Sequence, residues 1–187
     1  MKELSLNVLD IAENSVKAGA TLIGIRLDER GECLTLTVTD NGCGMKPEML
    51  KGVIDPFCTT RTTRKVGLGI PLLKLAAEQT GGKVEITSRH ESEYPETHGT
   101  EVVAIFFKNH IDFTPIGDIV STVTTLIQGS PEIDFEFLHD ADKFHVTLDT
   151  RQLREILGEE IPLSTPEVMR WIRQYLGEQY KNLSNQQ

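Results

Sequence analysis

Residues 4–18 read LSLNVLDIAENSVKA, and this stretch predicts the helix on which both the fold and the site depend. Leu4, Val8 and Ile11 recur at the helical period, so that one face of the helix can pack against a core. Gly19 follows as a residue that readily adopts the left-handed backbone found after a helix end. We therefore expect an amphipathic helix that stops at Gly19.

A second stripe on this helix is polar. Asp10, Asn14 and Lys17 stand at i, i+4 and i+7, which places them together roughly opposite the apolar stripe. A carboxylate, an amide oxygen and an ammonium group are the groups that a magnesium-nucleotide site needs. The alternative is that these three residues form an ordinary solvated helix face. The spacing by itself favours this alternative.

The following segments predict a sheet. Residues 22–27 and 34–39 alternate apolar and polar side chains, and turn residues 28–31 join them as a hairpin. Two more strands are expected at 84–88 and 100–107, with a helix at about 70–80 before them. This order predicts an α+β fold, a two-layer α/β sandwich with helices on one face of an antiparallel or mixed sheet.

A glycine-rich loop, DNGCGM at residues 40–45, comes directly after the second strand. Gly42 and Gly44 allow close backbone approach to a ligand. Asp40, at the strand end, can accept a hydrogen bond from an exocyclic amine such as that of adenine. By itself this pattern is more often a turn than a site.

Further along the chain, residues 61–65 (RTTRK) hold three cations that suit a small polyphosphate. Gly67 and Gly69 open the next helix, where free N–H groups and the positive dipole end favour phosphate. Each feature is a weak signal alone. The signal becomes specific when the features are taken together in their order along the chain: the polar helix stripe, the glycine loop, the basic run, the helix opened by glycines, and Gly99-Thr100.

Together these motifs resemble the GHKL superfamily of gyrase, heat-shock chaperone, histidine kinase and MutL ATPases. Residues 13–15 (ENS), 18–21 (AGAT) and 40–44 (DNGCG) are similar to the ATPase region of MutL proteins. Residues 55–60 (DPFCTT) and 67–70 (GLGI) resemble motifs of histidine kinases instead. The resemblance covers about residues 5–107 and implies a Bergerat ATP-binding fold.

The resemblance also implies roles for individual residues. Asn14 would be the magnesium ligand, and Asp40 would recognise the adenine amino group. The remaining ATP-binding residues that it implies are Lys17, Gly42, Gly44, Gly67, Leu68, Gly69 and Thr100. Residues 57–66 would form a lid, in which we expect at least one of Arg61, Arg64 and Lys65 to contact phosphate, although none of them has a fixed family equivalent. The implied cofactors are ATP and Mg²⁺.

Two departures from the family pattern bear on activity. Hydrolysing relatives carry a glutamate four positions before the metal asparagine, and Asp10, which is one methylene shorter, stands there. Since a general base must come within about 3 Å of the proton that it takes, we expect slow turnover with Asp10 as the catalytic residue. We also expect no phosphoacceptor hairpin, and we interpret His90 and His139 as surface loop histidines.

From about residue 108 the pattern changes. An amphipathic helix through residues 116–127, strands at 135–138 and 144–148, and two closing helices predict a small C-terminal α+β appendage. We therefore divide the chain into an ATPase domain, 1–110, and a small domain, 111–187, whose role is open and which we expect to bind a partner protein.

Composition narrows the class of protein. With 39% hydrophobic and 25% charged residues the chain is typical of globular proteins, and it lacks a membrane-length apolar run and a signal peptide, so we expect a cytoplasmic protein without membrane contact. Three cysteines without C-x-x-C spacing indicate neither disulfides nor zinc. The net charge of −9 argues against nucleic acid as a partner.

The leading hypothesis is a stand-alone histidine kinase-like ATPase or protein kinase that binds Mg-ATP and switches conformation with nucleotide. Closure of a lid would provide the differential contacts that such a switch needs. The alternatives are a serine kinase of the anti-sigma type and an ATP-binding adaptor whose C-terminal region recruits a partner. Whether ATP is hydrolysed or transferred, and the oligomeric state, stay open at this point.

Overall fold

The computed structural model describes residues 3–54, 68–158 and 160–184, and its centre is one mixed sheet of six strands. The strands are β1 Leu22–Arg30, β2 Cys33–Asp40, β3 Lys83–Arg89, β4 Gly99–Phe107, β5 Asp134–Ala141 and β6 Phe144–Asp149. Their order across the sheet is β3-β4-β2-β1-β5-β6. Neighbours are antiparallel except for β1 and β5, which run parallel.

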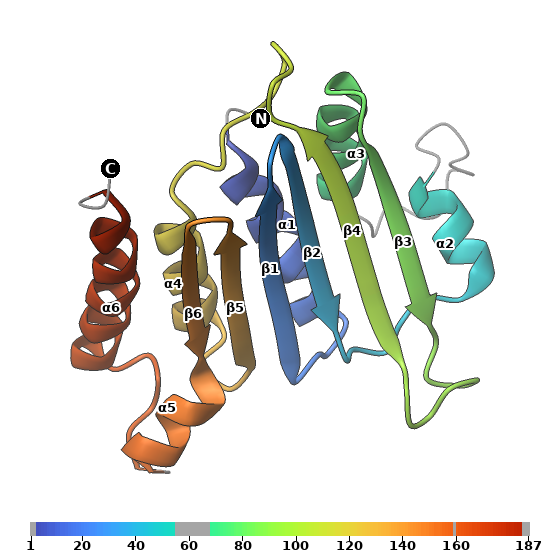
Figure 1. The fold of residues 1–187 in the computed structure, drawn as a ribbon. Coiled ribbons are helices and arrows are strands. Elements are labelled where there is room, and N and C mark those ends of the chain that lie inside the picture. The colour runs from blue at the N-terminus through green and yellow to red at the C-terminus, as the bar shows by residue number, and fades with distance from the viewer. Residues whose placement is uncertain (1–2, 55–67, 159, 185–187) are drawn as a thin grey trace.

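Helices form the second layer. They are α1 Leu4–Lys17, α2 Pro47–Ile54, α3 Gly69–Gln79, α4 Ile119–Gly129, α5 Thr150–Leu157 and α6 Pro166–Ser184. In Figure 1, α1, α3 and α4 lie behind the sheet, α6 stands beside β6, and α2 stands beside β3. The predicted α+β two-layer sandwich is confirmed. None of the helices in the described ranges is long and apolar enough to cross a bilayer.

The alternation read from the sequence places the core between the two layers. Ile23, Ile25 and Leu27 of β1 are buried, whereas Arg26 between them is exposed. On the helix side, Val8 and Ile11 of α1 are buried in the same cluster. Apolar burial of this kind stabilises by roughly 25 cal/mol per Å² removed from water. The amphipathic pattern of α1 therefore decides which of its faces meets the sheet.

Residues 111–187 continue this sheet and this core. β5 pairs with β1 along its length, from Leu22 beside Asp134 to Glu29 beside Ala141. Phe135 and Phe137 of β5 belong to the same buried cluster as the residues of β1. The division into two domains at residue 110 stays a prediction. In space, however, β5 of the C-terminal region lies directly against β1.

Two predicted turns extend less far than the sequence indicates. β1 continues to Arg30 and β5 to Ala141, so Glu29 and His139 lie inside strands. The interpretation of His139 as a surface histidine is wrong: its exposed fraction is 3%. Both ring nitrogens have partners, Tyr180 at 2.7 Å and Glu29 at 2.9 Å, and these bonds offset the cost of burying a polar ring.

Candidate functional site

A cavity of about 430 Å³ lies between α1, the end of β2, the glycine loop and the start of α2. Five of the residues singled out from the sequence line it: Asn14, Lys17, Asp40, Gly44 and Thr100. Apolar side chains, among them Val38 and Val102, form much of the remaining wall. A mostly apolar hollow with a few convergent polar groups is the usual form of a small-molecule site.

Asp40 is held in one orientation by three neutral donors. It ends β2 and pairs with Thr100 of β4, so its side chain is on the helix-facing side of the sheet, as Ile23 opposite it is. Its Oδ1 accepts hydrogen bonds from the backbone N–H of Gly42 at 2.9 Å and of Thr100 at 3.2 Å. Its Oδ2 accepts from the Ser15 hydroxyl at 2.6 Å. A carboxylate has about four acceptor positions, so the described residues leave one for a ligand.

The glycine loop requires its glycines. Gly44 has φ +68, and a Cβ there would collide with the carbonyl oxygen of Arg89. A Cβ on Gly42 would lie 2.8 Å from Cβ of Ala18. Gly42 is not among the residues that line the cavity, but it holds Asp40 through its N–H. Close backbone packing, which only glycine allows, therefore shapes this end of the site.

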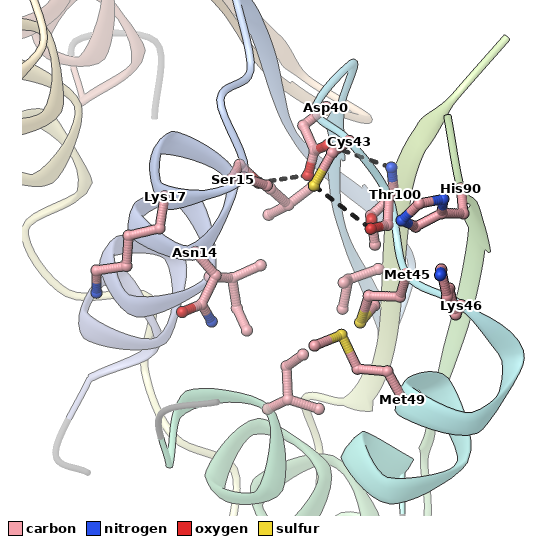
Figure 2. A pocket seen from close by; sticks show the side chains of 16 residues that line it. Asn14, Ser15, Lys17, Asp40, Cys43, Met45, Lys46, Met49, His90 and Thr100 are labelled. Carbon is pink, nitrogen blue, oxygen red and sulfur yellow. Dashed lines mark hydrogen bonds between the residues drawn. The ribbon is translucent and has the colours of Figure 1, made fainter. Parts of the chain in front are cut away.

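Asn14 and Lys17 project from α1 in different ways. Figure 2 shows the Asn14 amide in the space between α1 and α3, where no described residue bonds it, whereas Lys17 extends away from Asp40. The Lys17 ammonium lies 3.6 Å from Glu13 and its side chain is 70% exposed. Asn14 and Asp40 thus border the same cavity, while Lys17 contributes mainly its stem.

Asp10 lies beside the start of α3. A Cβ added to Gly69 would be 2.8 Å from Cβ of Asp10, so the two helices are in close contact there. Asp10 is half-buried and is not among the residues that line the cavity. Its catalytic role stays a prediction, and the close approach gives a reason for glycine at position 69.

The other predicted residues divide into two groups. Leu68 is 74% exposed, and Gly69 is buried at the first turn of α3. Arg64, Lys65 and Gly67, together with the whole expected lid at 57–66, lie outside the described residues. Their contacts with phosphate stay predictions.

Sequence reasoning missed Ser15 and His90. Ser15 is buried on α1, and its hydroxyl donates a hydrogen bond to Asp40. A hydroxyl on a buried helix face needs a partner, and that was the available signal. His90, interpreted as a surface loop residue, lines the cavity beside Thr100 (Figure 2). Its Nδ1 accepts from the Ser92 N–H at 3.1 Å, which leaves Nε2 to carry the proton of a neutral ring.

This fold and this cavity agree with a family match. The model of the histidine kinase-, DNA gyrase B- and HSP90-like ATPases matches residues 2–111, more than half of the chain. The chain belongs to this ATPase family. The predicted superfamily is therefore confirmed. ATP as the nucleotide is supported by membership of this family.

Individual relatives include a sensor protein and a mismatch repair endonuclease. Sensor protein SrrB of Staphylococcus aureus is 32% identical over 93 residues, which cover 47% of this chain and 16% of SrrB. Mismatch repair endonuclease pms1 of Dictyostelium discoideum is 41% identical over 59 residues, 32% of this chain and 6% of pms1. The chain thus spans only a small part of the length of these relatives.

A solved structure extends the likeness in fold. The Aquifex aeolicus MutL ATPase domain complexed with ADP superposes with a TM-score of 0.55 at 14% identity, covering 93% of this chain and 88% of that one. At this identity the match shows the fold alone. Because it covers 93% of this chain, the likeness in fold extends beyond residues 2–111, which the family model matches.

Proposed function

We propose that the chain binds Mg-ATP in the described cavity, with adenine at Asp40 and the phosphates towards Asn14 and the start of α3. The observation that carries this proposal is that Asn14 and Asp40 border one cavity while three donors fix the Asp40 carboxylate. A fixed acceptor matches the exocyclic amine of adenine. Membership of the ATPase family supports the same ligand.

Magnesium fits the phosphate end of the site. The Asn14 amide borders the cavity and supplies a hard oxygen, the ligand type that Mg²⁺ prefers. The bound ion would offset the negative charge of the phosphates. The first turn of α3, which begins at Gly69, offers N–H groups and a positive dipole end to the same phosphates.

For activity we propose slow hydrolysis or phosphoryl transfer, coupled to a nucleotide-dependent switch. Asp10 stands at the sequence position where hydrolysing relatives carry their glutamate base. It is shorter than glutamate and does not line the cavity. Since general bases act within hydrogen-bond reach of the proton, directly or through one water, turnover should be slow. Incubation with γ-labelled ATP distinguishes phosphate release from label transfer to protein.

Calorimetry tests the binding proposal. Wild type should bind Mg-ATP, and Asn14→Ala should weaken Mg-ATP binding by at least about tenfold while changing metal-free ATP binding much less, because the amide acts through the ion. Equal Mg-ATP affinity in wild type and Asn14→Ala contradicts the assigned site. Absence of any Mg-ATP binding by wild type contradicts the function.

An adaptor role, in which residues 111–187 recruit a partner protein, is the second proposal. Trp171 on α6 favours it, because this ring stacks on Tyr175 yet stays 48% exposed. Exposed tryptophan is enriched at protein interfaces. Removing the whole segment would strip β5 from β1, so the suitable test is Trp171→Ser, which should lose partner capture and keep Mg-ATP affinity.

A further inference from the structure

The loop between β3 and β4, residues 90–98, reaches the glycine loop and bonds its backbone. His98 Nδ1 lies 2.6 Å from the carbonyl oxygen of Gly42. The N–H of Glu91 donates to the carbonyl oxygen of Cys43 at 2.9 Å. From the end of β3, Ser88 Oγ accepts from the N–H of Met45 at 2.7 Å. Backbone groups at three positions of the glycine loop are thus held from this side.

The chemistry of the His98 contact fixes its direction. A backbone carbonyl oxygen can only accept, so Nδ1 of His98 carries the hydrogen. The donor reaches the glycine loop across 56 positions of the chain. The imidazole therefore supplies a long-range tether to the Gly42 carbonyl oxygen.

Gly42 connects this tether to the base end of the cavity. Its carbonyl oxygen accepts from His98, and its N–H donates to Asp40 Oδ1 at 2.9 Å. The next residue, Cys43, donates its N–H to Ala18 at the end of α1 and lines the cavity. A shift of Gly42 would therefore disturb the carboxylate that we assign to adenine.

We infer that His98 is a positioning residue of the nucleotide site: it clamps the glycine loop so that Asp40 is set for the base before nucleotide arrives. The inference rests on the proposed function. His98 acts through Gly42 and does not line the cavity itself. Its effect should consequently fall on adenine recognition and not on the phosphates.

Two substitutions of similar chemistry test the clamp. The Asn amide nitrogen occupies a place close to Nδ1 of histidine, whereas the Gln amide nitrogen lies close to Nε2. His98→Asn should keep ATP affinity within about twofold, and His98→Gln should lower it about five- to tenfold, the effect of one net hydrogen bond. ADP affinity should fall by the same factor as ATP affinity. Equal affinities in all three proteins overturn the inference, and so does a loss confined to ATP.

Hydrogen exchange provides a measurement without substitution. In the wild type, ATP should slow exchange of the Glu91 amide, because its acceptor is the glycine loop itself. An unchanged Glu91 amide in the presence of saturating ATP overturns the clamp even where His98→Gln folds poorly. Failure of the proposed function looks different: wild type itself would then bind no ATP.

Discussion

Two carboxylates of the same hairpin show how one chemical group serves two purposes. Asp40 ends β2, Glu29 lies near the end of β1, and both are on the helix-facing side at opposite ends of the hairpin. The described donors to Asp40 are all neutral, and Asp40 borders a cavity. Glu29 instead accepts from Lys108 Nζ at 2.6 Å and from His139 Nε2 at 2.9 Å.

The surroundings of Glu29 are closed. Tyr180 of α6 bonds the other nitrogen of His139 and packs its ring against that imidazole, and Phe144 packs there too. The bond from His139 and the charge and bond of Lys108 hold the pKa of Glu29 down at about 2 against burial, which acts in the opposite direction. Glu29 therefore joins β1, β5 and α6, while Asp40 keeps an acceptor position open. A lysine and a buried histidine around Glu29 make a structural joint, whereas neutral donors beside a cavity make a binding site.

The largest effect should come from Asp40→Asn. The substitution puts an NH₂ group where the adenine amine needs an acceptor, and a buried donor facing a donor is costly. We expect ATP affinity to fall at least about 100-fold, a change of about 2.7 kcal/mol. Calorimetry measures it, with thermal melting as the check on folding. A variant that binds ATP within fivefold of wild type would remove Asp40 from the base site.

Glu29→Gln should affect stability and leave binding alone. The free energy of unfolding at pH 7 should drop by about 2 kcal/mol, because the amide loses the charge that His139 and Lys108 face. ATP affinity should stay unchanged. Urea unfolding measures the loss, with the exposed Glu101→Gln as the matched control. A stability loss equal to that of the control would contradict the proposal that Glu29 links β1, β5 and α6.

The same carboxylate also sets a pH dependence of wild-type stability. Its folded pKa of about 2 lies below the ordinary 4.5, so its stabilisation is complete above about pH 4.5 and is lost as the pH falls towards 2. In Glu29→Gln this acid-dependent part of the unfolding free energy should be absent. Parallel pH profiles for the two proteins between pH 5 and pH 3 would contradict the assignment.

The smallest effect should come from Ser15→Ala. This change removes one of three donors to Asp40 and leaves the two backbone donors in place. ATP affinity should fall about fivefold, as expected for about 1 kcal/mol from a single hydrogen bond. Ser5→Ala, on the same helix but bonded to Glu3, is the control and should not change affinity. If both serine variants bind ATP equally well, Ser15 does not contribute to the base site.

The sequence determined much of the fold and the outline of the site. The stripe of α1 predicted its buried face, and alternation predicted the central hairpin. The glycine loop next to Asp40 predicted a close backbone approach that Gly44 confirms with its positive φ. These signals succeed because helical period, alternation and turn chemistry act between residues only a few positions apart.

Only the tertiary structure decided the partners of the polar groups. Ser15 meets Asp40 across 25 positions, His98 meets Gly42 across 56, and His139 meets Glu29 across 110. The parallel pairing of β5 with β1, which joins residues 111–187 to the sheet, is also a contact between segments far apart in the sequence. Nothing within a short window distinguishes a histidine that will be buried against a carboxylate from one that stays in water. That outcome depends on which distant surfaces pack together to bury apolar area, and it is settled only when the whole core forms.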